Sequence, residues 1–64
     1  MTGKVLFYKS KKGYGFIKQD KNPADIFFHF SNCNDIPEEK MRVQYEIAEG
    51  RKGLEAVNVS IIYN

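Results

Sequence analysis

The residues best suited to binding chemistry in this 64-residue chain are aromatic rings gathered in its first half. Seven of the nine aromatic residues fall between positions 7 and 30, together with the single histidine, His29. A core of this size cannot bury so many large rings beside its aliphatic residues, so some of them must lie on the surface. Exposed rings can stack on unpaired nucleobases, which contributes roughly 1–3 kcal/mol per base with little sequence preference.

Most of the positive charge lies in the same part of the chain. The net charge is only +2, but residues 1–21 carry six lysines and one aspartate, a net charge of +5, whereas residues 22–64 carry −3. Lysines around exposed rings would contact phosphate groups, so affinity would fall as salt rises. Each feature alone has a simpler explanation, because lysines can form a solvated face and rings can pack against one another. Their coincidence favours binding of single strands over duplexes, whose bases are already stacked.

Five short β-strands are expected to position these residues. Runs rich in β-branched and aromatic residues alternate with turn signals about every ten residues. The runs span residues 4–9, 14–18, 25–30, 42–47 and 54–63. Residues 32–40 are expected to form a loop with one helical turn. The pattern predicts an all-β chain with one domain over residues 1–64, folded as a five-stranded antiparallel barrel, because closure removes most exposed strand edges.

Side chains alternate between the two faces of a strand, which assigns an outer and an inner set. The outer set of the strands at 14–18 and 25–30 is Tyr14, Phe16, Lys18, Asp25, Phe27 and His29. The inner set is Gly15, Ile17, Ile26, Phe28 and Phe30, joined by Val43, Tyr45 and Ile47 of the strand at 42–47. If the strands at 14–18 and 25–30 pair, the outer set forms an aromatic platform fringed by lysine. Gly13 and Gly15 would let a planar base or a backbone approach closely.

Size and composition argue against several other classes of protein. One cysteine, Cys33, cannot form an internal disulfide. No apolar run approaches the ~18 residues of a membrane span, and the first residues lack the apolar core of a signal peptide. These features favour a cytoplasmic protein without a membrane partner. Because a chain this short cannot readily enclose a pocket, no enzymatic activity, cofactor or small-molecule substrate is expected.

Two constellations around His29 suggest catalysis or metal binding only at first sight. Asp25, His29 and Ser31 have the groups of a catalytic triad, but on one strand they would fan outward instead of hydrogen-bonding in sequence. Asp25, His29 and Cys33 have the i, i+4 spacing that converges on a helix, whereas this segment is predicted to be a strand. No catalytic or metal site is therefore predicted.

Two segments on the predicted platform resemble the two ribonucleoprotein motifs of the bacterial cold-shock protein family. They are Lys12-Gly13-Tyr14-Gly15-Phe16-Ile17 and Asp25-Ile26-Phe27-Phe28-His29-Phe30-Ser31. Residues 3–5, 50–53 and 56–59 are similar to the family's start, last turn and last strand, so the resemblance covers essentially the whole chain. It implies an OB-type barrel that binds single-stranded RNA and DNA. It also implies an RNA chaperone that melts structure in messages and assists translation, often after a temperature drop.

The resemblance also implies which residues bind. It places surface aromatic residues at Phe7, Tyr8, Tyr14, Phe16, Phe27, His29 and Phe30. It places polar contacts to phosphate or base at Lys12, Asp25 and Lys52. Alternation turns Phe30 inward, whereas the family displays it at the edge of the platform, so the two arguments disagree at this residue.

The chain departs from the family's pattern at three places. The family has tryptophan where this chain has Phe7 and usually lysine where it has Leu6, so stacking and charge should be weaker there. The loop of residues 31–41 lacks the family's usual aromatic residue. Leu54 stands in place of a proline, and the apolar end at residues 61–63 could extend the sheet, cover the bottom of the barrel or form a dimer edge. A monomer is nevertheless expected.

Two alternatives share the small barrel. An SH3-type barrel uses an aromatic surface for proline-rich peptides, but usually with acidic loops instead of a lysine-rich face. An S1-type translation initiation factor has the same barrel but would not predict the two motifs. The SH3-type barrel is therefore the main alternative from another functional class.

Overall fold

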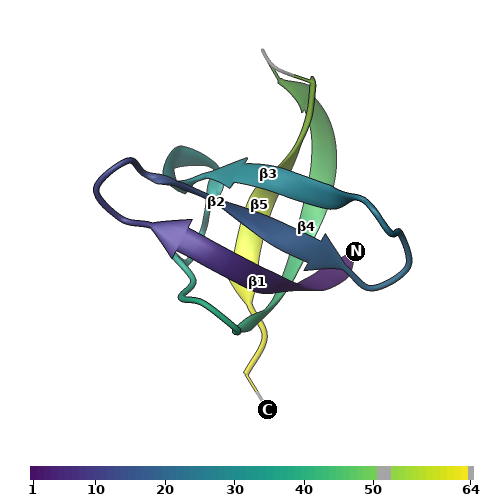
Figure 1. Cartoon of the computed structure of the whole chain (residues 1–64), viewed down its shortest axis with the longest axis horizontal. Helices are drawn as coiled ribbons and strands as arrows, with labels where there is room; N and C mark the ends of the chain where they lie inside the picture. Colours follow the sequence, from purple (N-terminus) through teal and green to yellow (C-terminus); the bar gives the residue numbers. More distant parts are fainter. Residues whose placement is uncertain (51–52, 64) are drawn as a thin grey trace.

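The computed structural model describes residues 1–50 and 53–63 and contains five β-strands closed into a barrel (Figure 1). The strands are β1 (Thr2–Lys9), β2 (Tyr14–Gln19), β3 (Asp25–His29), β4 (Arg42–Gly50) and β5 (Gly53–Ile61). A short 3-10 helix, η1 (Phe30–Asn32), follows β3 directly. The prediction of an all-β, OB-type barrel is confirmed.

The strand directions correct one part of that prediction. The strands are neighbours in the order β1-β2-β3-β5-β4. Among the described residues four pairings are antiparallel, but β3 and β5 run parallel, with Phe27 opposite Glu55 and Phe28 opposite Ala56. A fully antiparallel barrel is therefore wrong at this pairing. The reason is geometric, because directions cannot alternate all the way around a closed ring with an odd number of strands.

The barrel encloses a core to which all five strands contribute. Its buried side chains are Val5, Ile17, Ile26, Phe28, Val43, Tyr45, Ala56 and Val59. The inner set predicted from alternation in β2, β3 and β4 is confirmed for every member except Phe30. Ile47, its last member, is half-buried against the core. The prediction succeeds in these segments because each one is a regular strand, where the period of two is a local property of the backbone.

A bulge in β1 turns Phe7 to the outside of the barrel. Val5 pairs with Ile17 and Phe7 pairs with Phe16, so Leu6 is an extra residue between two successive pairings. Without the bulge Val5 and Phe7 would share a face, because side chains alternate along a strand. With it, Val5 is buried in the core while Phe7 lies on the same outer face as Phe16.

The end of β3 decides the position of Phe30. β3 ends at His29 and the chain turns into η1, so alternation no longer applies to Phe30. Its side chain is 47% exposed. The inward placement of Phe30 is therefore wrong, and the surface position implied by the family resemblance is the one that the structure shows. The helical turn expected at residues 32–40 lies at Phe30–Asn32 instead.

Candidate nucleic-acid interface

The outer face of β1, β2 and β3 brings together most of the predicted aromatic residues. The β2–β3 ladder pairs Tyr14 with His29, Phe16 with Phe27, and Lys18 with Asp25. Phe7 joins from β1, opposite Phe16. The two strands therefore do pair, which is the condition under which the sequence predicts an aromatic platform. The term "aromatic face" is used below for Phe7, Tyr14, Phe16, Phe27, His29 and Phe30.

Four of these rings form one continuous cluster. The ring centroid of Phe16 lies 5.6 Å from that of Phe7, 6.4 Å from that of Tyr14 and 5.8 Å from that of Phe27. Tyr14 and Phe27 stack on each other at 5.8 Å with an interplanar angle of 25°. These separations are typical of favourable aromatic pairs. All four side chains are half-buried, so their mutual packing orients them while part of each ring stays accessible.

His29 and Phe30 form a second pair of rings, with centroids 4.6 Å apart. The backbone N–H of Ser31 donates to His29 Nδ1 at 3.2 Å, and the Ser31 hydroxyl lies 2.8 Å from the same nitrogen. The N–H contact assigns Nδ1 as an acceptor, which leaves the N–H of Nε2 to donate a hydrogen bond to a ligand.

This contact also corrects the expectation that His29 and Ser31 diverge. They would do so on a continuous strand, but η1 turns Ser31 back toward the imidazole. Asp25 begins β3, whereas His29 ends it. The three groups therefore do not line up as a triad.

The two glycines of the first motif are each close to the protein's own groups. A Cβ atom added to Gly13 would lie 2.6 Å from Cδ1 of Phe30. A Cβ atom added to Gly15 would overlap the carbonyl oxygen of Phe7 and lie 2.8 Å from the ring of Phe28. The close approach of a backbone is confirmed at Gly15. At Gly13 the space is filled by Phe30 instead of being open to a base.

Tyr8 is the predicted aromatic residue that the structure places elsewhere. It is half-buried and packs against the core. Its ring stacks on the buried ring of Phe28, with centroids 5.9 Å apart and an interplanar angle of 14°. Tyr8 therefore packs with the core instead of joining the cluster of rings on the aromatic face.

Two of the charged residues predicted for the site, Lys12 and Asp25, lie at the margins of the aromatic face. Lys12 is exposed in the turn between β1 and β2, and Asp25 is exposed at the start of β3. The Nζ atom of Lys9 lies 5.8 Å from the centre of the Phe7 ring, which is a cation–π distance. Lys52 lies outside the described residues.

A groove beside the β3–β5 pairing extends the site beyond the residues expected from the sequence. It has a volume of about 300 Å³ and is lined by Phe16, Asp25, Phe27, Gly53, Leu54 and Glu55. Sequence reasoning missed Glu55 as a site residue because only the parallel pairing of β3 with β5 brings it opposite Phe27. No local pattern in residues 53–61 could have indicated this neighbour.

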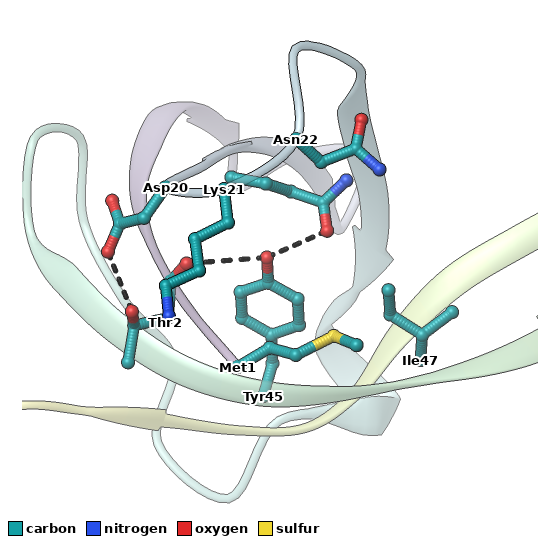
Figure 2. A pocket seen from close by; sticks show the side chains of 8 residues that line it. Met1, Thr2, Asp20, Lys21, Asn22, Tyr45 and Ile47 are labelled. Carbon is teal, nitrogen blue, oxygen red and sulfur yellow. Dashed lines mark hydrogen bonds between the residues drawn. The ribbon is translucent and has the colours of Figure 1, made fainter.

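A separate cavity of about 390 Å³ shares no lining residue with the aromatic face (Figure 2). Figure 2 shows the ring of Tyr45 in this cavity, with Met1 and Ile47 to one side. The Tyr45 hydroxyl donates to Gln19 Oε1 at 3.0 Å. Burial, reinforced by the Asp20 carboxylate, raises the pKa of Tyr45. The phenol therefore stays neutral and ties β4 to β2.

An ion pair beside this cavity joins the turn after β2 to the start of β4. The two terminal nitrogens of the Arg42 guanidinium, Nη1 and Nη2, donate to the Asp20 carboxylate at 2.8 and 2.5 Å. The Thr2 hydroxyl donates to the same carboxylate at 2.6 Å. These hydrogen bonds hold the pKa of Asp20 well below its usual range, and those from Arg42 have the largest effect. The side chains of Thr2, Asp20 and Arg42 therefore hydrogen-bond to one another.

Cys33 lies half-buried just after η1. Burial and, second, the charge of Asp35 raise the pKa of its thiol to about 11. The thiol donates to the carbonyl oxygen of His29 at 3.6 Å. Across residues 1–50 and 53–63, no three His, Cys, Asp or Glu side chains gather where they could hold a metal ion. The same part of the chain has no helix long and apolar enough to cross a membrane.

The fold and this face together define a class of protein: a small OB-type barrel that displays aromatic rings and lysines on one outer face. The family model described as the 'Cold-shock' DNA-binding domain matches residues 1–62. The chain belongs to this nucleic-acid-binding family.

Individual relatives are similar over nearly the whole chain. The chain is 45% identical to the major cold shock protein of Micrococcus luteus, covering 92% of this chain and 94% of that protein. It is 41% identical to a cold shock-like protein of Thermotoga maritima, and the match covers 97% of this chain and 98% of that protein. It is 36% identical to a cold shock protein of Arthrobacter globiformis, and the match covers 94% of this chain and 96% of that protein.

Proposed function

We propose that this protein binds single-stranded RNA and DNA on the aromatic face and acts as an RNA chaperone that assists translation or cold adaptation. One observation carries most of the proposal: Phe16 and Phe27 lie opposite each other at the centre of an accessible ring cluster. Rings held in this way offer flat apolar surfaces to unpaired bases, whereas a duplex keeps its bases stacked inside. The names of the relatives, which are cold shock proteins, support the cellular role.

The proposed binding residues divide by the contact that each would make. Stacking is assigned to Phe7, Tyr14, Phe16, Phe27, His29 and Phe30, whereas Tyr8 is stacked on the core residue Phe28. Contacts to phosphate are assigned to Lys12 and Lys52, and hydrogen bonds to base edges are assigned to Asp25 and to Nε2 of His29. Lysines supply affinity without sequence preference, because every nucleotide carries the same phosphate.

The proposed activity is a shift of an equilibrium and requires no bond to be made or broken. A protein that binds the single strand and not the hairpin favours the open RNA by mass action. Stacking suits this task because every base has a ring face, so many messages can be bound. We therefore propose a binding protein without catalysis, acting as a monomer in the cytoplasm.

A titration followed by NMR tests the ligand class and the site together. A uridine heptamer is expected to shift the amide signals of residues 14–16 and 27–30, while a GC-rich RNA duplex that stays paired at the temperature of the titration shifts them far less. A proline-rich peptide serves as the comparison. If the peptide perturbs these signals and the heptamer does not, the SH3-type alternative replaces the proposal.

A further inference from the structure

The groove beside β5 gives one border of the aromatic face a different chemistry from the rest. Its walls combine the rings of Phe16 and Phe27 with two acidic side chains, Asp25 and Glu55. Lys9 and Lys12, by contrast, lie at the end of β1 and in the turn that follows it. Among the residues that the structure describes, the charged side chains lining the groove are therefore both acidic, whereas those at the turn between β1 and β2 are basic.

Glu55 is held in a defined position in this groove. Its Oε1 atom accepts a hydrogen bond of 3.1 Å from the side-chain amide of Asn32 in η1. A Cβ atom added to Gly50 would lie 2.5 Å from Glu55 Oε2, so the carboxylate occupies space that only a glycine leaves open. A group oriented before binding loses less conformational freedom when a ligand arrives.

Asp25 adds a second set of acceptor oxygens to the same groove. It is exposed and lies opposite Lys18 in the β2–β3 ladder, and it forms no ion pair with any residue that the structure describes. Ionised carboxylates only accept hydrogen bonds. Phosphate groups would be repelled here, so a strand would direct its backbone toward the lysines and the edge of a base toward the carboxylates.

We propose that this groove selects guanine at the base stacked on Phe27, and that Glu55 is the residue that determines this preference. The inference rests on the proposed binding of single strands. The pairing edge of guanine carries two adjacent donors, the ring N–H and the exocyclic amino group, which match a carboxylate.

The other bases fit the groove less well. Uracil and thymine offer one N–H between two carbonyl oxygens, and those oxygens would face the carboxylates. Adenine and cytosine each place a ring acceptor beside the amino group. Guanine also carries a carbonyl oxygen, but that oxygen lies beyond the ring N–H and outside the pair of donors. In every other base, one of the two neighbouring atoms that would face the carboxylate is an acceptor.

The test compares two heptamers on the same protein at one salt concentration: oligodeoxythymidine and the same strand with one central dG. Fluorescence anisotropy gives the ratio of the two Kd values. A strand can slide along the site, so a single guanine is sufficient to reach the groove. We expect wild-type protein to prefer the guanine strand roughly tenfold, which is the size of one good bidentate contact.

The Glu55→Gln variant is expected to reduce the preference to roughly threefold or less, because the amide cannot accept two hydrogen bonds side by side. The ratio cancels changes in overall charge and in folded fraction, since both strands meet the same protein. Glu46→Gln is the matched control. It removes an equal charge from β4, where Glu46 accepts a hydrogen bond from Asn58 and does not line the groove.

Each outcome is decisive. Equal affinity of wild-type protein for the two strands overturns the inference while leaving single-strand binding intact. An unchanged preference in Glu55→Gln, or an equal loss in Glu46→Gln, removes the role of Glu55. If neither strand binds, the proposed function fails and the inference fails with it.

Discussion

The ring of Phe30 lies against the backbone of Gly13, where any side chain on residue 13 would overlap it. Gly13 has a φ of 76°, in the left-handed region that glycine adopts readily. Its carbonyl oxygen also accepts a hydrogen bond of 2.9 Å from the N–H of Phe30. One glycine therefore shapes the turn between β1 and β2 and positions the ring at the edge of the aromatic face.

The Gly13→Ala substitution is expected to destabilise the protein for two reasons, the left-handed φ and the overlap with Phe30. Together they should lower the free energy of unfolding by about 1–3 kcal/mol, measured by urea denaturation. The Phe30→Ala background separates the two causes, because the backbone strain remains while the overlap disappears. A penalty of the same size in both backgrounds would show that the contact with Phe30 is unimportant.

The Phe16→Ala and Phe27→Ala substitutions are each expected to weaken binding of a uridine heptamer by roughly 1–3 kcal/mol, because each removes a stacking surface. Fluorescence anisotropy measures the loss, and circular dichroism checks that the barrel is retained. Tyr63→Ala is the matched control, since it removes a ring that is 79% exposed beyond the end of β5. The aromatic face is the wrong site if Tyr63→Ala weakens binding as much, or if neither phenylalanine substitution does.

The salt dependence of binding is expected to report the contact of Lys12 with phosphate. The logarithm of affinity should fall linearly with the logarithm of salt concentration, and Lys12→Gln should reduce the slope by about 0.7. Lys21→Gln is the control, because Lys21 lies in the turn at the other end of β2 and lines the separate cavity. A slope that changes equally in both variants would indicate net charge instead of a specific contact.

The ion pair of Asp20 with Arg42 should make stability depend on pH. The pKa of Asp20 is held below its ordinary value of 3.8 by hydrogen bonds from Arg42 and Thr2, so the unfolded chain takes up a proton at higher pH than the folded one. The stabilisation is therefore complete above about pH 5 and is lost as pH falls below 4.

Asp20→Asn should accordingly lower Tm at pH 7, with a difference from wild type that shrinks toward pH 2. The effect should be small, because the pair is on the surface and water screens it. Thermal unfolding across this pH range measures it. Asp25→Asn, which removes a carboxylate without a described ion pair, should leave Tm nearly unchanged. A difference as large at pH 2 as at pH 7 would contradict the assignment.

Local patterns in the sequence were sufficient to predict the centre of the aromatic face. Within β2 and β3 the alternation of side chains assigned Phe16 and Phe27 to one side and Ile17 and Phe28 to the other. The structure agrees, because a regular strand fixes the direction of each side chain through its own backbone. The family resemblance added the exposure of Phe30, which alternation had assigned to the core.

Local patterns failed where the regular strand is interrupted. The bulge at Leu6 places Phe7 outside, where the family resemblance puts it, but leaves Tyr8 stacked on Phe28, although the resemblance implies a surface position for Tyr8 as well. A bulge depends on how two strands meet, so it does not appear in the alternation of either strand alone.

The sequence by itself therefore determined the class of fold, the core of the inner faces and the family, because these follow from periodicity and from two contiguous motifs. Only the tertiary structure decided that Glu55 lies opposite Phe27 with its carboxylate bonded to Asn32, and that Phe30 fills the space at Gly13. Those contacts join residues far apart in the chain. The contact of Glu55 depends on closing an odd-numbered barrel through one parallel pairing, and that of Phe30 depends on the pairing of β2 with β3. No local pattern encodes either of them.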